Sequence, residues 1–439
     1  MGKSRQVLYG IALTLAVSAT GAAQAASDRF VPFGEFVGSV RSAPLTRYAA
    51  VPQAQVQTAA DFEQMRAHIL RMYDGVHVKH SYALASEIYD CLPIMEQPSV
   101  RLQRITRIAT PVAAPHSTHG ASLLANGSMP ATQLEPDQKI DRFGNAIGCE
   151  AGTVPLRRVT LGEITKFRTL QDFFHKLPFQ LSPDATTPVS VHKYAHASQT
   201  INNHGGGQII NLWDPAVDTS QTEVFSLAQH WFVNFLTSGK PETVEGGWQD
   251  FPAKYGIAKP VLFIYWTADG YNKTGCYNTD CAAFVQVNSN VHLGAPFAHY
   301  STKNGTQYTL DISWYQTGGN WWLYVGGSQS TNAVGYYPGT LYAKTPMANK
   351  ASTIDYGGET VGTTAWPPMG SGKLPDSGFG ISAYQRYIHY FTMSNNFADA
   401  TLSPSQLSPT CYKIKVTNNS TDASFRSYFY FGGPGGTGC

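Results

Sequence analysis

Charged residues are scarce in this sequence, and their signs nearly cancel. Only 14% of the residues are Asp, Glu, Lys or Arg, against roughly a quarter in an average soluble domain. The 31 Lys and Arg residues are balanced by 29 Asp and Glu residues, so the chain has no excess positive charge with which to hold a polyanion. The composition therefore excludes proteins that bind nucleic acid or an anionic membrane through net charge.

Several catalytic and ligand-binding motifs are absent as well. The sequence contains no G-x-S-x-G elbow, no H-E-x-x-H, no P-loop and no G-x-G-x-x-G that opens a helix. His192 and His196 lie four residues apart in a stretch with the composition of a strand. There they would share one face about 13 Å apart, too far to share a metal ion. We therefore expect neither a metal nor a cofactor.

The sequence also lacks an apolar run of the ~18 to 20 residues that a membrane helix needs. The N-terminus instead has two basic residues, an apolar stretch from about Val7 to Ala19, and an Ala23-Gln24-Ala25 site. This combination predicts a secretory signal peptide over residues 1–25. We expect an exported protein, extracellular or periplasmic, that begins near Ala26 and has no membrane partner.

Six cysteines in an exported chain predict three disulfides. Fifteen connectivities exist for six cysteines, and pairing by neighbourhood is the simplest of them. The expected pairs are Cys91 with Cys149, Cys276 with Cys281, and Cys411 with Cys439. Such pairing leaves no free thiol for cysteine chemistry.

A chain of 439 residues is long enough for two domains. In its first part, residues 61–75 place apolar side chains on one face, with Asp61 as the expected N-cap and a glycine at the end. A second helix is expected over residues 169–177. The proline-rich stretch 177–191 is typical of an exposed linker. We expect a smaller α+β prodomain over residues 26–185.

The later part consists of short runs of β-branched and aromatic residues separated by Gly, Pro, Asn and Ser. Such runs, without a helical period between them, predict an antiparallel β-sandwich or barrel over residues 186–439. The runs are 261–270, 282–287, 306–315, 321–327, 385–393, 411–418 and 426–433.

Glutamates are rare in this later part, and two of them have unusual neighbours. Glu245 precedes Gly-Gly-Trp, and Glu359 follows Tyr-Gly-Gly. Glycines beside a strand carboxylate let another backbone approach closely, as a groove for an extended peptide requires. The other two, Glu223 and Glu242, stand among polar turn residues and are expected to be solvated.

Two carboxylates that meet in a groove can divide acid and base work. At ~4 Å and an effective dielectric of ~20 they repel by about 4 kcal/mol, or roughly three pKa units, and so share one proton. One carboxyl group then acts as the acid and the other as the base, in proteases and in glycosidases alike. Aromatic residues such as Trp321 and Trp322 would suit sugar stacking, although core packing is the favoured interpretation. These residues alone leave a peptidase and a carbohydrate-active protein open.

A set of long motifs resembles the neprosin domain, in the same order along the chain. In the first half, EIYDCLPIMEQPSV and GCEAGTVPLRR resemble that family's activation-peptide region, and the likeness runs from about residue 85 to the C-terminus. The motifs of the second half are EVFSLAQHWFVN (223–234), TVEGGWQDFP (243–252), LFIYWTADGYNKTGCYNTDCAAFVQV (262–287), GNWWLYV (319–325), VGYYPGTLY (334–342), and YGGET with MGSG (356–372).

The resemblance implies a glutamic endopeptidase with a β-sandwich fold, secreted as a zymogen and cleaving after proline. The family's two catalytic glutamates would be Glu245 and Glu359, and the same three disulfides are implied. Gly246 and Thr360 stand where the plant members usually have alanine and valine, which bears on the proline preference more than on the chemistry.

The implied partners are an extended peptide or unfolded protein as substrate and the chain's own prosegment as inhibitor, in an expected monomer. Trp248 and Tyr271 are candidates for lining the groove, and Gln229 for donating to the oxyanion, with packing as the favoured role of each. The alternative is a secreted carbohydrate-binding or glycoside-hydrolysing sandwich, and a third is a catalytically silent scaffold.

Overall fold

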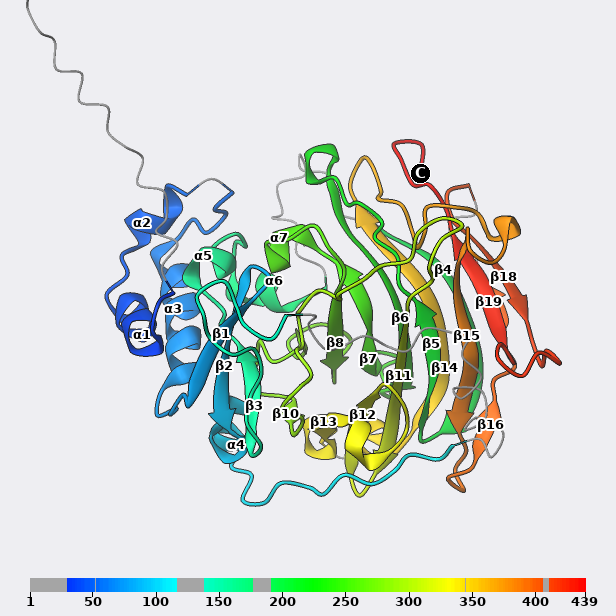
Figure 1. Ribbon diagram of the computed structural model, residues 1–439, viewed down its shortest axis with the longest axis horizontal. Coiled ribbons are helices and arrows are strands. Elements are labelled where there is room, and N and C mark those ends of the chain that lie inside the picture. Colours follow the sequence, from blue (N-terminus) through cyan, green and yellow to red (C-terminus); the bar gives the residue numbers. More distant parts are fainter. Residues whose placement is uncertain (1–29, 52, 117–137, 177–190, 344, 406–409) are drawn as a thin grey trace, which may run out of the picture. The chain divides into compact units, whose positions relative to one another are not determined.

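The computed structural model describes residues 30–51, 53–116, 138–176, 191–343, 345–405 and 410–439. The predicted signal peptide and residues 177–190 of the predicted linker lie outside these ranges. Pro32–Cys439 form one compact unit. It holds an N-terminal part, residues 32–176, and a larger all-β part, residues 191–439, which we call the sandwich (Figure 1).

The N-terminal part packs short helices against a small antiparallel sheet of order β1-β2-β3. Its strands are β1 (His80–Leu84), β2 (Glu87–Pro93) and β3 (Thr153–Arg157). Its helices are α1 (Phe33–Arg41), α2 (Leu45–Ala49), α3 (Ala59–Tyr73), η1 (Ile94–Glu96), α4 (Pro98–Leu102), α5 (Leu161–Ile164) and α6 (Leu170–Phe174).

Both predicted helices form, with different ends. Helix α3 begins two residues early because Thr58, not Asp61, is its N-cap: the Thr58 hydroxyl accepts from the Asp61 backbone N–H at 3.0 Å. The apolar face buries as predicted. Helix α6 is capped by Thr169 and ends at Phe174. Its early end leaves Lys176 in a bend after the helix, from which its side chain reaches Glu245 of the sandwich.

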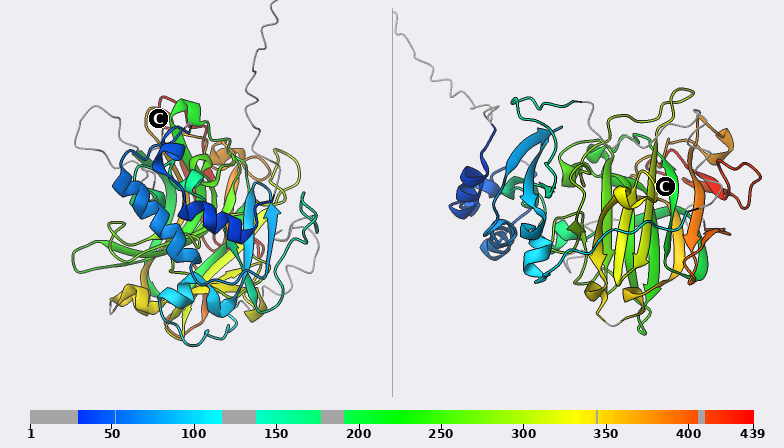
Figure 2. Two further views of the ribbon diagram at one scale, coloured as in Figure 1. Left: turned by 90° about the vertical axis from the view of Figure 1, so that its left-hand side faces the viewer. Right: turned by 60° about the horizontal axis from the view of Figure 1, so that its bottom comes forward.

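In the described ranges, the sandwich consists of two antiparallel sheets, which confirms the predicted fold class (Figure 2). The seven-stranded sheet has the order β17-β4-β14-β6-β7-β8-β9, and the nine-stranded sheet the order β10-β13-β12-β11-β5-β15-β19-β18, with β16 beside β15.

Strands of the first sheet are β4 (Val191–Asn203), β6 (Glu223–Phe235), β7 (Pro241–Asp250), β8 (Val261–Thr267), β9 (Cys276–Tyr277), β14 (Ala351–Gly362) and β17 (Ser403–Ser405). Those of the second are β5 (Gly205–Asn211), β10 (Val285–Gln286), β11 (Thr309–Thr317), β12 (Asn320–Val325), β13 (Ala333–Pro338), β15 (Ala383–Phe391), β16 (Phe397–Asp399), β18 (Lys413–Thr417) and β19 (Tyr428–Gly432). Connecting these strands are η2 (Thr219–Gln221), α7 (Pro252–Tyr255), η3 (Ser330–Asn332), η4 (Gly339–Tyr342), η5 (Pro346–Ala348) and η6 (Pro375–Ser377).

The main core lies between the two sheets and is rich in aromatic rings, Trp248, Trp314 and Trp321 among them. Two glycines beside the glutamates let the sheets approach. A Cβ on Gly246 would lie 3.0 Å from Ile312 Cδ1, and one on Gly358 would lie 2.5 Å from Met369 Sδ. These glycines therefore face the core, on the opposite side of their strands from the carboxylates.

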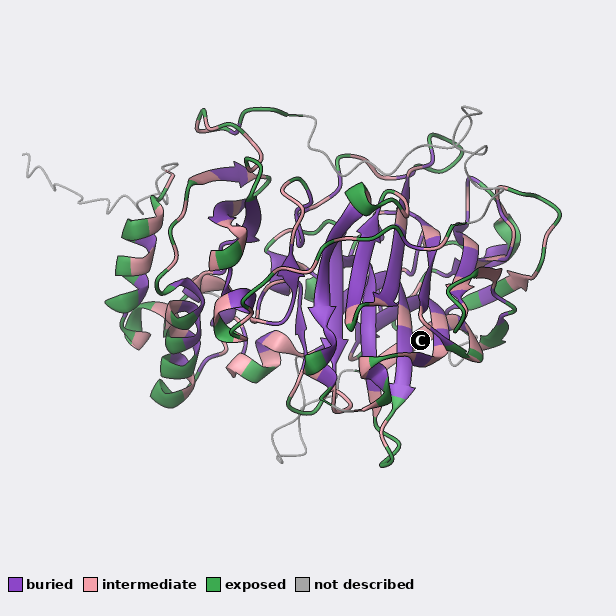
Figure 3. Cartoon of the chain, turned by 90° about the horizontal axis from the view of Figure 1, so that it is seen from below, coloured by how far each residue is buried: buried purple, intermediate pink, exposed green. Residues whose placement is uncertain are grey.

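A second core joins the N-terminal part to the outer face of the seven-stranded sheet. Phe173 of α6 and Phe167 pack with Phe251, Phe225 and Phe263 of the sandwich. Strand β8 is consequently buried on both faces, as its continuous apolar sequence indicates. Figure 3 shows the same pattern: the sandwich strands are buried along most of their length, and exposed residues gather on helices and loops.

All six cysteines lie in the described ranges and form the predicted pairs, Cys91–Cys149, Cys276–Cys281 and Cys411–Cys439. Three disulfides are compatible with an extracellular protein. None of the helices in the described ranges has the length and apolar character of a membrane-spanning segment.

Candidate active site

Three neighbouring strands of the seven-stranded sheet bring Glu359, Gln229 and Glu245 onto one face. Gln229 on β6 lies opposite Gly357 of β14 on one side and Gly247 of β7 on the other. Because side chains alternate along a strand, the residue two positions from each glycine points the same way as Gln229. Those residues are Glu359 and Glu245, so the two glutamates meet across the sheet although 359 − 245 = 114 positions separate them.

The glycines on either side of Gln229 keep this face bare. A Cβ on Gly247 would lie 2.0 Å from the Ala228 carbonyl oxygen, and one on Gly357 would lie 2.4 Å from the Ala195 carbonyl oxygen. Side chains do not fit at either position. In its own row across the sheet the Gln229 side chain therefore has only glycines beside it, and it is 2% exposed because the N-terminal part covers it.

One buried ammonium group lies between the two carboxylates. Lys176 Nζ pairs with Glu245 Oε2, donates to Gln229 Oε1 at 3.0 Å, and lies 3.6 Å from Glu359 Oε2. The Lys176 side chain is only 6% exposed, and those of Glu245 and Glu359 are 1% and 3% exposed. The N-terminal part therefore covers the two glutamates with a charge of opposite sign.

Neutral hydroxyl groups hold Glu245 from the other side. Tyr271 Oη donates to Glu245 Oε1 at 2.7 Å, and Thr243 Oγ1 donates to the same oxygen at 2.8 Å. Burial, together with the Glu245 charge, raises the pKa of Tyr271 well above its ordinary value. The phenol therefore keeps its proton and serves as a donor.

Glu359 has a more polar environment. Gln229 Nε2 donates to its Oε2 at 3.2 Å, Tyr194 Oη donates to its Oε1 at 3.3 Å, and His192 Nδ1 also contacts Oε1. Burial alone would raise the pKa of Glu359, but the Lys176 charge and the His192 hydrogen bond outweigh it and lower that pKa to about 2. Glu359 is thus an ionised carboxylate in this state of the protein.

A cavity of about 390 Å³ opens beside Glu359. Asp355 accepts from His196 at 2.7 Å, and the His196 ring stacks on Trp231 with centroids 5.8 Å apart. The lining residues are Lys176, His192, Tyr194, His196, Gln229, Trp231, Tyr271, Asp355 and Glu359. The cavity is therefore lined by charged side chains and by aromatic rings.

The other residues singled out in the sequence lie in different environments. Tyr271 and Gln229 line the cavity, whereas Trp248 is buried in the main core, where its indole N–H donates to the Asn211 carbonyl oxygen at 3.0 Å. Glu223 is half-buried, but the expectation that Glu242 is solvated is wrong. Glu242 is buried, and the Thr345 hydroxyl donates to it at 2.7 Å.

Sequence reasoning missed Lys176, His192 and Tyr194. His192 and His196 were considered only as a metal pair. In the structure His192 contacts Glu359 and His196 contacts Asp355, both on the neighbouring strand β14. Within the described ranges, no group of three or more His, Cys, Asp or Glu side chains could hold a metal ion. Tyr194 is the residue opposite Glu359, and His192 lies opposite Val361 and reaches Glu359 diagonally. This register comes from the fold, so the sequence carried no signal for His192.

Comparison with solved structures returns scytalido-glutamic peptidase twice. One crystal structure, with a transition state analog inhibitor, has 6% identity and a TM-score of 0.31, over 55% of this chain and 98% of that chain. Another, with a peptide based transition state analog, has 8% identity and a TM-score of 0.29, over 56% and 99%.

The sequence model of the Neprosin family matches residues 222–434. This range contains both glutamates, Gln229 and Tyr271, and it covers most of the sandwich. Residues 222–434 of this chain are therefore a Neprosin domain, the family that the motifs indicated.

Proposed function

We propose that this chain is a secreted glutamic endopeptidase in which Glu245 and Glu359 activate water to hydrolyse a peptide bond. The Neprosin domain supports a peptidase of the glutamic type. The observation that carries the proposal is the position of Lys176, whose single ammonium group contacts both carboxylates beside a cavity. Without that cation two buried carboxylates cannot both stay ionised, so they hold one proton between them.

The surroundings of the two glutamates assign their roles. When Lys176 leaves, Glu359 still has Gln229, Tyr194 and His192 to stabilise its charge, whereas Glu245 has two hydroxyl donors. Glu359 is therefore the ionised base and Glu245 the protonated acid. Gln229, freed from Lys176, is placed to donate to the oxygen that gains charge.

The reaction then needs neither a metal nor a covalent enzyme intermediate. Glu359 accepts a proton from water while the water oxygen attacks the peptide carbonyl carbon, and Glu245 donates its proton to the carbonyl oxygen. The tetrahedral diol expels the amine as Glu359 passes its proton to the peptide nitrogen. Glu245 recovers its own proton from the hydroxyl group when the carbonyl re-forms.

Residues 26–185 act as a prosegment that keeps the enzyme latent. Lys176 supports this role because it occupies the position between the carboxylates that a substrate carbonyl and a water molecule would need. The prosegment's α6 also covers the outer face of the catalytic sheet. Cleavage after proline, which the family resemblance implies, would suit the stacked rings of His196 and Trp231 that line the cavity.

Acid should release the prosegment. The pKa of Glu359, lowered to about 2 from an ordinary 4.5, means that its ionised form stabilises the closed state. That stabilisation is present above about pH 4.5 and is lost as the pH falls toward 2. Glu87 acts oppositely, since burial raises its pKa to about 7 and its protonation on acidification favours the closed state. N-terminal sequencing after incubation at pH 3 and at pH 7 should show a new start near residue 186 only at pH 3.

A start that stays near residue 26 at both pH values would contradict prosegment removal. The same samples can be heated to measure the unfolding temperature. A loss of folded structure at pH 3 before any cleavage would separate general acid denaturation from release.

His192 is expected to set the pH at which the base becomes active. Its hydrogen bond and charge lower the Glu359 pKa, so the His192→Asn enzyme, freed of its prosegment, should show the acidic limb of kcat/KM moved about one unit toward neutral pH. The maximal rate should change by only a few-fold. Thr417→Val, on the other sheet, is the matched control. An unchanged acidic limb in the His192→Asn enzyme would show that His192 does not set the pH at which Glu359 acts.

The proposed function itself is tested by what the acid-treated protein digests. It should cleave a proline-rich protein at acid pH in the presence of EDTA and of reagents for serine and cysteine peptidases, and it should leave polysaccharides intact. Identification of the new chain ends by mass spectrometry then tests the preference for proline. Inhibition by EDTA, or hydrolysis of a polysaccharide instead, would overturn the proposal.

A further inference from the structure

An extended segment of the prosegment crosses the outer face of the nine-stranded sheet, far from the glutamates along the chain. Residues 104–116, which we call the strap, leave α4 and run across β13, β12 and β11 without forming a helix or strand of their own (Figures 1 and 2). The strap sequence is RITRIATPVAAPH. It lies on the sandwich as a bound peptide would.

Hydrogen bonds join the strap backbone to the sandwich. The Tyr336 hydroxyl accepts from the Ala109 N–H at 3.3 Å, and the Tyr324 hydroxyl donates to the Val112 carbonyl oxygen at 2.6 Å. The Ala114 N–H donates to the Ser328 carbonyl oxygen at 2.9 Å. These contacts involve the backbone of the strap and not its side chains, so a chain of different sequence could form them.

The surface beneath the strap is a row of aromatic rings. Tyr315, Trp322 and Tyr336 are in register across β11, β12 and β13, and Tyr324 lies two positions along β12 on the same face. The Trp322 and Tyr336 ring centroids are 4.7 Å apart. All four side chains are buried, and Ile105, Ile108, Ala109 and Ala114 pack on the same cluster.

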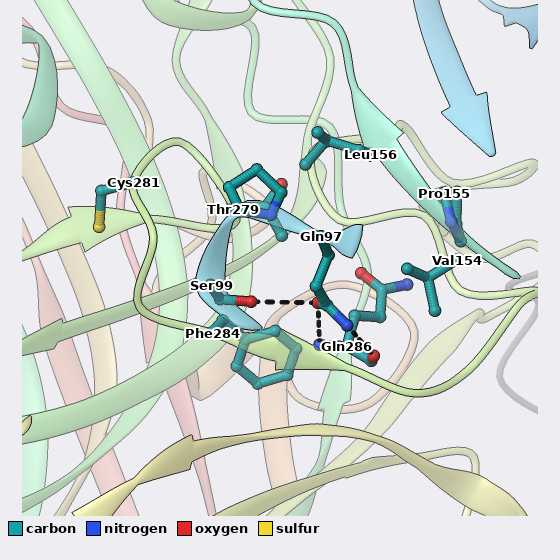
Figure 4. A pocket seen from close by; sticks show the side chains of 10 residues that line it. Gln97, Ser99, Val154, Pro155, Leu156, Thr279, Cys281, Phe284 and Gln286 are labelled. Carbon is teal, nitrogen blue, oxygen red and sulfur yellow. Dashed lines mark hydrogen bonds between the residues drawn. The ribbon is translucent and has the colours of Figure 1, made fainter. Parts of the chain in front are cut away.

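At the edge of the same sheet, the side-chain amide of Gln97 takes the place of a neighbouring peptide group. The Gln97 side chain donates to the Gln286 carbonyl oxygen at 2.9 Å and accepts from the Gln286 N–H at 2.8 Å (Figure 4). Its amide thus pairs with edge strand β10 in both directions, as a neighbouring peptide group would. Loss of the prosegment would leave this edge and the aromatic row without their present cover.

We propose that the aromatic row of Tyr315, Trp322, Tyr324 and Tyr336 is, in the mature enzyme, a docking site for an extended, proline-containing segment of a protein substrate. The inference rests on the proposed function, because the prosegment must leave first. The strap indicates the chemistry of the occupant: two prolines, small apolar residues and an extended backbone. Aromatic shelves with hydroxyl groups bind such segments because an extended, proline-rich chain loses little conformational entropy on docking.

The docking site and the glutamates lie on different sheets, on the two outer faces of the sandwich. A substrate can therefore engage both sites only if it is long and unfolded. Docking raises the local concentration of such a chain at the glutamates and leaves short peptides unaffected. The site would thus select for unfolded proline-rich proteins.

The test uses the acid-matured enzyme and a fluorescent synthetic peptide of the strap sequence, residues 104–116. The peptide should bind the mature enzyme and not the zymogen, whose site is filled. It should inhibit cleavage of a long proline-rich protein more strongly than hydrolysis of a short peptide, with which it competes only at the glutamates. Absence of binding, or equal inhibition of both substrates, would overturn the proposal.

A double variant tests the hydrogen bonds without removing the rings. In Tyr324→Phe with Tyr336→Phe, KM for the long substrate should rise roughly tenfold with kcat unchanged, because two backbone contacts are lost. KM for the short peptide should not change. Tyr430→Phe, on β19 of the same sheet, is the control and should behave as wild type. Equal KM values for the double variant and wild type on the long substrate would contradict the site, as would binding of a polysaccharide in place of the peptide.

Failure of the docking site and failure of the peptidase are distinguishable. If the chain is not a peptidase, the short peptide is not hydrolysed by any variant. If only the docking site is wrong, the short peptide is hydrolysed normally and the strap peptide does not bind.

Discussion

Replacing Glu359 with glutamine is expected to reduce kcat for peptide hydrolysis about 10³-fold to 10⁴-fold in the mature enzyme. A glutamine amide fills the same space and can be held by Gln229 and Tyr194, but it cannot take a proton from water. General-base catalysis of this kind contributes about 10² to 10⁴ in rate. Initial rates on a short proline-containing peptide at acid pH measure the loss, with the prosegment removed by an added protease so that maturation does not depend on activity.

The Glu245→Gln enzyme should lose less, about 10²-fold, because its amide can still donate a hydrogen bond to the developing oxyanion. Glu223→Gln is the matched control, since Glu223 is a half-buried glutamate at the start of β6, and it should retain wild-type rates. Unfolding temperatures within a few degrees of wild type would show that each variant folds. Wild-type activity in the Glu359→Gln enzyme would contradict the dyad.

Replacing Lys176 with methionine is expected to remove latency. Methionine fills the space of the lysine stem, but the two glutamates then face each other without a cation. Breaking a buried ion pair in this way costs about 3 to 5 kcal/mol, and here the cost falls on the closed state alone. The variant should therefore mature at a pH at least one unit closer to neutral than wild type. The measurement is the fraction of chain cleaved after incubation over a series of pH values.

Lys79→Met is the control for this change, because Lys79 is an exposed lysine of the same proposed prosegment. It should mature as wild type does. A Lys176→Met protein that stays latent over the same pH range as wild type would show that the lysine does not hold the prosegment closed. Lys176→Arg should preserve latency only partly, since a planar guanidinium fits poorly in a position built for one nitrogen.

The strands of the sandwich could be predicted because their local composition is typical of buried strands. Residues 306–315 and 321–327 have the β-branched and aromatic runs of buried strands, and they form β11 and β12. Residues 282–287 form only the two-residue strand β10, because only Val285 and Gln286 pair with β13. Constraints of that kind come from pairing in space and are not visible in a run of residues.

Helix ends were harder to predict, for a physical reason that α3 illustrates. Thr58 and Asp61 are both good capping residues, and the choice between them depends on which one has extended backbone angles. In the structure Thr58 does, and its hydroxyl also donates to the Asp61 carboxylate at 2.5 Å. The sequence carries both residues but not the backbone angles that choose between them.

The candidate site was only half predictable. Glu245 and Glu359 could be singled out because charge is scarce and each adjoins two glycines, although only Gly247 and Gly357 face their side of the sheet. Lys176 could not be found in this way, since it lies 69 residues from Glu245 and follows a short helix. Its role depends on where α6 ends, which local sequence does not fix.

The pH dependence of kcat/KM for a short peptide tests most directly whether Glu359 is the base and Glu245 the acid. The mature wild-type enzyme should give a bell with both limbs in the acid range, the lower limb from Glu359 and the upper limb from Glu245. The Glu245→Gln enzyme, slower throughout, should keep the lower limb and lose the upper one. An upper limb that persists unchanged in the Glu245→Gln enzyme would contradict the account.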